Sequence, residues 1–224
     1  MKNKTVVFIA VIMLLLYGKS FSQVVDVDGN IYQTVKIGNQ VWTAENLNTS
    51  HYRNGDTIIQ IDDITQWENN VGGAWCYFKL GDFNLYNNEF EIVKPYGKLY
   101  NWYAVNDERG LAPEGWHVAT LDDWKTLLDY LGGYEVAGGK MKTYARWQSP
   151  ADIDVNSSGF TILYGGYRSH RGYFYDFDKY AYFWTSTEEK DGYCWCYDLF
   201  AQSNTVVRYT HIKGNGLSVR CVKD

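Results

Sequence analysis

The chain has 224 residues, of which 46% are hydrophobic and 17% aromatic, and its formal net charge at pH 7 is −5. This composition can bury a sizeable core, which excludes an intrinsically disordered chain and a miniprotein held only by disulfides, and the acidic balance argues against nucleic acid as a partner. The 20 tyrosines, 9 tryptophans and 21 glycines favour a β-rich fold of short strands over a helical bundle.

Residues 1–22 have the pattern of a secretory signal peptide. Two lysines precede the apolar run 6–17, and Ser20 and Ser22 form a small-x-small cleavage site. We therefore expect a mature chain that starts at Gln23 and is secreted or otherwise extracytoplasmic, in the periplasm or on the cell surface. The apolar run is shorter than the roughly 20 residues of a membrane span, and no later segment resembles one. An uncleaved anchor is the alternative interpretation.

Residues 23–224 are expected to form a single domain, and its first part is predicted to consist of short strands. Asp28 and Gly29 mark one turn, and the pair at 38–39 separates two strand-like runs as a tight hairpin. Residues 49–94 are polar and less regular. They are interpreted as a long loop region with short strands, which Trp67, Trp75 and Tyr77 anchor to the core.

The clearest helix is predicted to begin after Thr120, whose hydroxyl can cap it, with two aspartates in the first turn. Its apolar residues recur at helical spacing and form one buried stripe, made of Trp124, Leu127, Leu128 and Leu131. Two glycines at 132–133 provide the stop. A shorter helix is predicted over 99–105, and a third near Lys140.

The chain from residue 159 onward is predicted to be extended throughout. Strand-like runs are separated by Gly, Asn, Asp and Ser and cover 160–164, 182–185, 192–200, 205–209 and 217–222. They predict an antiparallel meander with aromatic ribs. Together with the predicted helices, this pattern indicates the α+β class.

Several segments together resemble a known family. They follow one another at 26–30 (DVDGN), 35–42 (VKIGNQVW), 44–47 (AENL), 96–105 (YGKLYNWYAV), 113–118 (PEGWHV), 165–168 (GGYR), 184–188 (WTSTE) and 218–224 (SVRCVKD). From about Val25 to the last residue the chain resembles the Fibrobacter succinogenes major paralogous domain family. That family comprises secreted and cell-surface bacterial proteins without an established activity.

The family in turn is similar to the C-type lectin-like superfamily, which includes the formylglycine-generating-enzyme type of fold. The resemblance implies a β-rich C-type lectin-like fold with one long capped helix, one or two short helices and a C-terminal antiparallel meander. Many family members carry a cysteine where this chain has Ala112. A bridge from there to Cys221 is therefore excluded.

The four cysteines are disulfide candidates, because export permits oxidation: Cys76, Cys194, Cys196 and Cys221. At least one is expected to be bridged. Cys194 and Cys196 lie two apart in an extended run and point to one face, which is poorly suited to bridging each other. The alternative is a metal or copper pair completed by His117 or His211, a weak signal because the ligand set is incomplete.

A basic and aromatic stretch stands out in this acidic chain. Aromatic faces can stack on a ligand and arginine can bind carboxylates, so we expect recognition at the loops 167–178 and 186–193. The candidate ligand-binding residues are Tyr167, Arg168, Tyr173, Tyr175 and Trp184. In the competing interpretation Arg168 pairs internally with Glu188 or Asp176 and the tyrosines cover the core.

Clustered carboxylates suggest a calcium site, because calcium prefers oxygen ligands. The candidates are Asp176, Asp178, Glu188, Glu189 and Asp191. They lack the glycine and terminal glutamate of a calcium loop, and a solvated acidic face is the alternative. His117 could act as a general base, but no nucleophile or metal pattern accompanies it, which favours a structural turn histidine.

The sequence thus predicts a non-catalytic recognition module that binds an extracellular glycan or protein. No catalytic residue is assigned, and no cofactor is expected apart from the calcium suggested above. Two alternatives stay open. One is an oxidase of the formylglycine-generating type, or another extracytoplasmic enzyme, with Cys194 and Cys196 as its redox or copper pair. The other is a purely structural surface protein.

Overall fold

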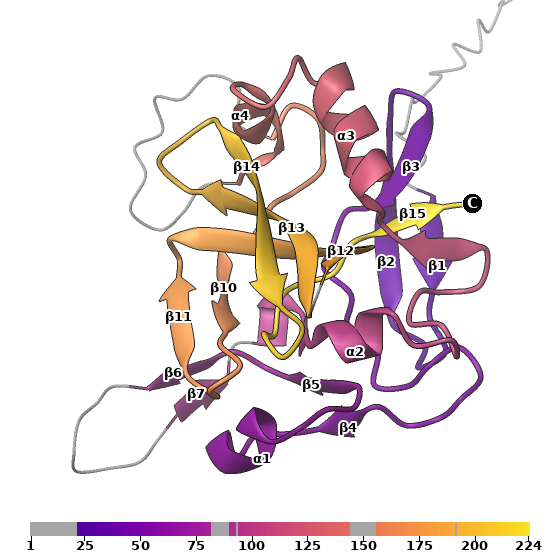
Figure 1. Cartoon of the computed structure of the whole chain (residues 1–224). Helices are drawn as coiled ribbons and strands as arrows, with labels where there is room; N and C mark the ends of the chain where they lie inside the picture. Colours follow the sequence, from indigo (N-terminus) through magenta and orange to yellow (C-terminus); the bar gives the residue numbers. More distant parts are fainter. Residues whose placement is uncertain (1–21, 82–89, 93, 144–155, 191) are drawn as a thin grey trace, which may run out of the picture.

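The computed structural model describes all residues except 1–21, 82–89, 93, 144–155 and 191. The fold is α+β and rich in strand, as predicted, and is built around two five-stranded sheets (Figure 1). The predicted signal peptide, apart from Ser22, lies outside the described residues. Within the described part of the chain no helix is long and apolar enough to cross a membrane.

The first sheet joins the two ends of the domain. Its order is β1 (Gln23–Val25), β2 (Ile31–Ile37), β3 (Gln40–Thr43), β15 (Cys221–Lys223) and β9 (Trp116–Val118). The predicted hairpin is confirmed, and Gly38 takes a positive φ of 61° in its turn. The predicted strand 217–222 is wrong in extent and place. β15 pairs with β3 and β9 and is not part of the C-terminal meander.

The second sheet contains the predicted meander. Its order is β11 (Phe174–Phe177), β10 (Gly165–Arg168), β12 (Tyr180–Lys190), β13 (Tyr193–Phe200) and β14 (Val206–Ile212). β12, β13 and β14 pair antiparallel in sequence order. The predicted strand 160–164 is not one of the named strands, because Ile162 forms only an isolated bridge to Lys142.

The segment interpreted as a long loop holds more regular structure than expected. It contains β4 (Ile59–Gln60), α1 (Ile64–Glu68), β5 (Ala74–Cys76), β6 (Lys79–Gly81) and β7 (Phe90–Ile92), followed by the 3₁₀ turn Lys94–Tyr96 and β8 (Leu99–Tyr100). β4, β5 and β8 form a small sheet, and β6 pairs with β7. Trp67 and Trp75 are buried and anchor this segment.

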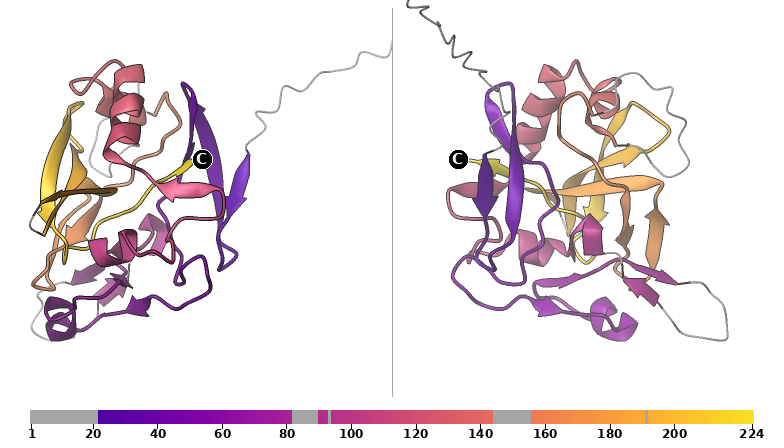
Figure 2. Two further views of the ribbon diagram at one scale, coloured as in Figure 1. Left: turned by 45° about the vertical axis from the view of Figure 1, so that its right-hand side comes forward. Right: turned by 180° about the vertical axis from the view of Figure 1, so that it is seen from behind.

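The long helix, α3 (Leu121–Tyr130), forms as predicted. Thr120 accepts from the Asp123 backbone N–H, and the Asp123 carboxylate accepts from the Thr120 backbone N–H, so the start is capped in both directions. Its apolar stripe is buried between the two five-stranded sheets (Figure 2). The ring of Trp124 lies 5.4 Å from that of Trp42 in the first sheet and stacks on Tyr197 of the second at 5.0 Å.

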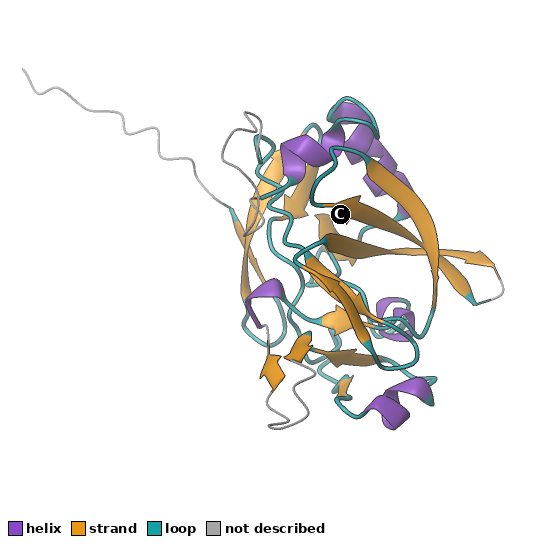
Figure 3. Cartoon of the chain, turned by 90° about the vertical axis from the view of Figure 1, so that its left-hand side faces the viewer, coloured by secondary structure: helices purple, strands orange, loops and turns teal. Residues whose placement is uncertain are grey.

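The other helices are short. α4 (Ala137–Met141) lies where the third helix was predicted, and α2 (Trp102–Val105) is shorter than the predicted helix over 99–105. It begins late because Leu99–Tyr100 pairs as strand β8 and Asn101 caps the helix. α3 and α4 lie at one end of the molecule and α1 at the other (Figure 3).

Candidate functional site

One face of the second sheet gathers aromatic and polar side chains. Alternate residues of a strand point to the same side of a sheet, so the pairing register decides which residues share that face. The pairing register sets Tyr182 of β12 opposite Asp198 of β13. The next row in the same orientation sets Trp184 opposite Cys196, which in turn pairs with Tyr209 of β14. Residues that are far apart in sequence thus share one surface.

Aromatic rings run across this face in an unbroken series. Tyr175 stacks on Tyr167 with centroids 5.5 Å apart, and Tyr167 meets Tyr182 edge-on at 4.9 Å. Tyr180 stacks on Tyr182 at 5.7 Å and on Phe200 at 4.8 Å. We call the resulting surface the tyrosine face and define it by Tyr167, Tyr175, Tyr180, Tyr182, Phe200 and Tyr209.

A glycine allows β10 and β11 to approach closely at the edge of this surface. Gly166 has a positive φ of 62°, and a Cβ there would lie 2.3 Å from the Tyr175 carbonyl oxygen. Only glycine fits, since any side chain would push the two strands apart. This contact helps to hold Tyr167 and Tyr175 in their stacked arrangement.

The tyrosine face is open to solvent at its edges and closed at its centre. Tyr175 is 47% exposed and Tyr209 57% exposed, with Val207 also exposed beside them. Tyr182 is buried in the middle of the series. Large aromatic side chains exposed next to one another are typical of interaction surfaces.

Carboxylates and a histidine border these rings. The Tyr182 hydroxyl donates to Asp176 Oδ2 over 2.8 Å, and burial together with this hydrogen bond raises the pKa of Tyr182 well above its ordinary value. The ring of His211 lies 5.6 Å from those of Tyr182 and Tyr209. The face therefore combines stacking surface with hydrogen-bond acceptors.

Three of the five predicted ligand-binding residues have exposed or half-buried side chains. Tyr167 and Tyr175 come together on the tyrosine face. Tyr173 is 48% exposed in the preceding turn, where its carbonyl accepts from the Ser169 N–H. These three side chains are therefore accessible to a ligand.

Arg168 was wrongly predicted as a ligand contact, because its side chain is fully buried. It follows Tyr167 in the strand and so points to the opposite side of the sheet. Its guanidinium donates to four backbone carbonyls, those of Ile61, Asp62, Asp63 and Gly172. The alternative pairing of Arg168 with Glu188 or Asp176 is also not among its contacts.

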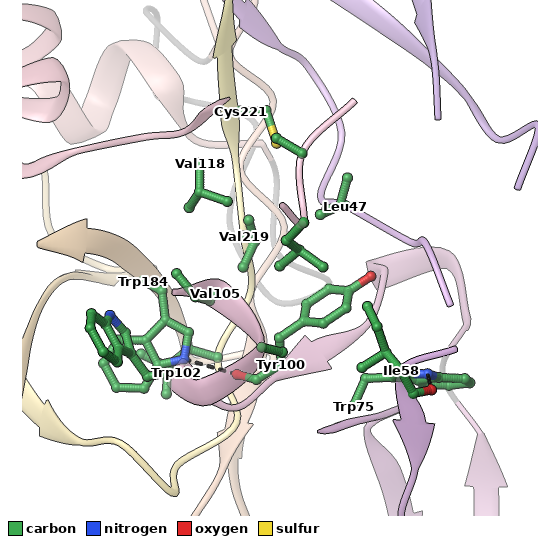
Figure 4. Packing of buried hydrophobic residues seen from close by; sticks show 14 of the residues in the cluster. Leu47, Ile58, Trp75, Tyr100, Trp102, Val105, Val118, Trp184, Val219 and Cys221 are labelled. Atoms are coloured by element: carbon green, nitrogen blue, oxygen red, sulfur yellow. Dashed lines mark hydrogen bonds between the residues drawn. The ribbon is translucent and has the colours of Figure 1, made fainter. Parts of the chain in front are cut away.

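Trp184 is the second correction, because it lies in the core. Its side chain is fully buried, and its indole Nε1 donates to the Tyr100 carbonyl oxygen over 2.8 Å (Figure 4). Val219 and Trp102 belong to the same cluster. Trp184 points to the same side of β12 as Tyr180 and Tyr182, but it lies where the core covers the strand, so it is closed to a ligand.

The predicted calcium ligands do not form one site. Asp176 lies in β11 and Asp178 in the turn before β12, whereas Glu188 and Glu189 lie near the far end of β12. Eight residues of extended chain separate the two pairs by roughly 25 Å. Glu188 instead pairs with Lys213 over 2.5 Å, and Asp191 lies outside the described residues.

All four cysteines are free and buried in the structure, so the expected disulfide is not present. Cys194 and Cys196 sit on adjacent like-facing positions of β13, as predicted, and are not bridged. Burial raises the pKa of the thiols of Cys76, Cys194 and Cys221 to about 12, which makes them poor nucleophiles at neutral pH.

We expect four titratable thiols per chain in denaturant and very slow reaction of these thiols in the native protein, because none is exposed. Titration with a thiol-specific chromophore, with and without denaturant, measures both. A chain freshly exported by its host that yields two thiols or none in denaturant would show that a disulfide forms.

His117 has a structural position. Its Nδ1 lies 2.7 Å from Asp224 Oδ1, and its Nε2 lies 3.0 Å from Asp123 Oδ2, the carboxylate that also caps α3. Burial opposes the charged ring, but the hydrogen bonds to Asp224 and Asp123 outweigh it and raise the pKa of His117. The histidine thus links the helix start to the last strand.

This pairing predicts a small pH dependence of stability. Because the folded pKa of His117 lies above the unfolded value, its contribution is full below the unfolded pKa of about 6.5 and is lost as pH rises through the folded pKa. We expect less than about 1 kcal/mol, since the ring is 39% exposed. Thermal melts from pH 6 to 8 should show a decline that His117→Gln removes. An equal decline in both proteins would contradict this.

Sequence reasoning missed Tyr180, Asp198, Phe200 and Tyr209 as members of one surface, and it considered His211 only as a metal ligand. Asp198 on β13 and Tyr209 and His211 on β14 do point to the same side of the sheet, because side chains alternate along each strand. That signal could have grouped them only if the pairing register of the strands had been known.

A pocket elsewhere is the competing place for a ligand. It has a volume of about 250 Å³ and lies beside β1, lined by Asp26, Thr49, Arg53 and the segment 111–114. The Arg53 guanidinium there already donates to the carbonyls of Ala112 and Trp116. The positive charge that lines this pocket is thus already used to hold the segment around Ala112 and Trp116.

Comparison with known proteins gives a family. The model of the Fibrobacter succinogenes major domain matches residues 35–223. No curated protein and no solved structure matches the chain. The match covers the whole second sheet, α3, and the first sheet except β1 and the start of β2. The chain therefore belongs to the Fibrobacter succinogenes major domain family.

Proposed function

We propose that the protein is an exported recognition module that binds a glycan through the tyrosine face. The observation that carries this proposal is the series of contacting rings on one sheet, which runs from Tyr175 through Tyr167 and Tyr182 and reaches Tyr209 through the ring of His211. Tyr175 and Tyr209, at the two ends, are both about half exposed. A rigid β scaffold holds these side chains, so little conformational entropy is lost when a ligand stacks on them.

A sugar suits the chemistry of this surface better than a flat hydrophobic ligand does. Its ring presents apolar C–H faces that can lie on tyrosines, and its hydroxyl groups can donate to carboxylates such as Asp176 and Asp198. Tyrosine hydroxyls at the exposed edges can add further hydrogen bonds. A protein ligand is the alternative partner, to be separated from a glycan by experiment.

Export supports the same proposal. The lysines before an apolar run and the Ser20 and Ser22 cleavage pattern are those of a secretory signal peptide. A module on the cell surface or in the periplasm would meet polysaccharides there. Intact-mass measurement of the exported protein should give a chain that starts at Gln23.

A relationship to the C-type lectin-like fold is part of this proposal. It is supported by the capped helix α3, the following Gly-Gly-Tyr-Arg strand β10 and the tryptophan-bearing strands β12 and β13. A fold likeness alone does not establish ligand binding. The glycan proposal therefore depends on the tyrosine face.

An oxidase of the formylglycine-generating type has less support. It would use Cys194 and Cys196 as a redox or copper pair, but among the described residues the cluster of ligand-type groups around Cys196 contains Asp198 and His211 and does not include Cys194. Both thiols are buried. We therefore favour recognition over catalysis.

A glycan array with the mature protein, run with and without calcium, tests the proposal. The Tyr175→Ala, Tyr209→Ala double variant should bind the best glycan roughly ten- to a hundredfold more weakly, because each lost stacking contact is worth about 0.5–1.5 kcal/mol. Its melting temperature should change little, since both rings are half exposed.

Tyr130→Ala is the matched control, because Tyr130 is a 66% exposed tyrosine on α3. It should bind as the wild type does. Undiminished binding by the double variant, or an equal loss in the control, would contradict the proposed site. Binding only to protein partners, again lost in the double variant, would keep the site and change the ligand class.

A further inference from the structure

Three groups of metal-binding type converge on the same side of the second sheet as Tyr182 and Tyr209. Cys196 and Asp198 lie two apart on β13 and point to the same side, and His211 projects from the paired strand β14. One ligand atom of each, the thiol sulfur, a carboxylate oxygen and an imidazole nitrogen, lies within 4.8 Å of the other two. This is the one such group among the described residues.

The separations suit atoms that share a cation. Cys196 Sγ lies 3.5 Å from Asp198 Oδ1, and His211 Nε2 lies 3.8 Å from Asp198 Oδ2. In a tetrahedral zinc site, with bonds of about 2.0–2.3 Å, neighbouring ligand atoms are about 3.3–3.6 Å apart. The 3.8 Å separation is too long for a hydrogen bond and needs only a small closure to fit this geometry.

The His211 Nε2 atom is also a buried polar atom without a hydrogen-bond partner. Its ring is fixed from the other side. The backbone N–H of His170 donates to Asn215 Oδ1, so the Asn215 Nδ2 donates to His211 Nδ1 over 2.9 Å. Buried polar atoms in native proteins are nearly always satisfied, so an orphan facing a thiol and a carboxylate points to a missing partner.

We propose that Cys196, Asp198 and His211 form a binding site for a zinc-class divalent cation. This inference goes beyond the proposed recognition function and does not depend on it. Sulfur and imidazole ligands favour zinc over calcium or magnesium, which prefer oxygen alone. Three protein ligands leave a fourth position for water or for an oxygen of a bound molecule.

The surroundings are consistent with a partly enclosed site. Cys196 is fully buried, while the side chains of Asp198 and His211 are 16% and 15% exposed, which leaves a narrow approach from solvent. The rings of Tyr182 and Tyr209 flank the histidine. Such an apolar rim limits water access and holds the imidazole in place.

The tautomer of His211 supplies a variant that should strengthen binding. Coordination through Nε2 places the ring proton on Nδ1, so the Asn215 amide must turn its oxygen toward that atom. In Asn215→Asp one carboxylate oxygen can accept from His211 Nδ1–H while the other keeps the His170 N–H. We expect its affinity for the cation to rise on the order of tenfold.

Titration of the reduced mature protein with Co²⁺, followed by displacement with Zn²⁺, tests the proposal. The wild type should bind one equivalent and show a thiolate-to-cobalt charge-transfer band, which zinc removes. Cys196→Ser should lose the band, and His211→Gln should bind at least tenfold more weakly. Cys194→Ser, which removes the neighbouring buried thiol outside the cluster, should keep both band and affinity.

Several results would overturn the proposal. They are a wild type without the charge-transfer band, equal loss of the band in Cys194→Ser and Cys196→Ser, and weaker binding by Asn215→Asp. The wild-type spectrum decides the matter even if a ligand variant fails to fold, because the band itself reports thiolate coordination. No glycan is present in the titration, so failure here leaves the recognition proposal unaffected.

Discussion

Replacing Arg168 with methionine should lower the free energy of unfolding by about 3–5 kcal/mol, because several backbone carbonyl groups lose a charged hydrogen-bond donor. The guanidinium is fully buried, and its loss leaves the carbonyls of Ile61, Asp62, Asp63 and Gly172 without this donor. It also lies 4.4 Å from the ring of Trp67, so a cation–π contact is lost as well.

Arg171→Met is the matched control, since Arg171 is an exposed arginine three residues along the chain. Its effect should stay within about 0.5 kcal/mol. Chemical denaturation of both variants measures the difference. If Arg168→Met kept wild-type stability and lost only ligand binding, Arg168 would belong to a recognition surface after all.

The second large effect is expected for Trp184→Ala, which should cost about 3–5 kcal/mol by removing a buried indole. The change opens a cavity among Tyr100, Trp102 and Val219 and removes the donor to the Tyr100 carbonyl. The neighbouring hairpin strand offers a comparison, because Trp195 is half-buried and its ring faces Arg208.

Trp195→Ala should therefore cost clearly less than Trp184→Ala, although both remove the same side chain. Thermal or chemical unfolding of the two variants gives the comparison. Equal losses, or a larger loss for Trp195→Ala, would mean that the core is not where the structure has it.

Features fixed by neighbouring residues could be predicted from the sequence. The hairpin of β2 and β3 depends on Gly38 and its flanking strands, and α3 depends on the Thr120 cap and one apolar stripe. Both were predicted at nearly the observed positions, because turn chemistry and helical periodicity act over a few residues.

Features that depend on pairing between distant segments could not be predicted from the sequence. β15 continues the chain beyond the meander yet pairs with Trp42 of β3 and His117 of β9, and no local pattern selects those partners. The extent of burial along β12 likewise depends on distant segments. Tyr180 is half-buried and Trp184 is fully buried, although they share a face, because the loops that cover the far end of the strand come from elsewhere in the chain.

Only part of the candidate site could be predicted from the sequence, for the same reason. The aromatic stretch at 167–175 was identified from composition, but alternation in a strand already separates Tyr167 from Arg168. The partners on β13 and β14, Asp198, Tyr209 and His211, join the site only through the register. Composition thus indicated the surface, and pairing decided its members.

The most direct test of the tyrosine face is chemical-shift mapping of the labelled mature protein by NMR, with the tightest-binding glycan from the array. We predict the largest changes at Tyr167, Tyr175, Tyr209 and His211, and small changes around Arg53. Changes centred on the pocket that Arg53 lines, with the tyrosine face unaffected, would contradict this prediction.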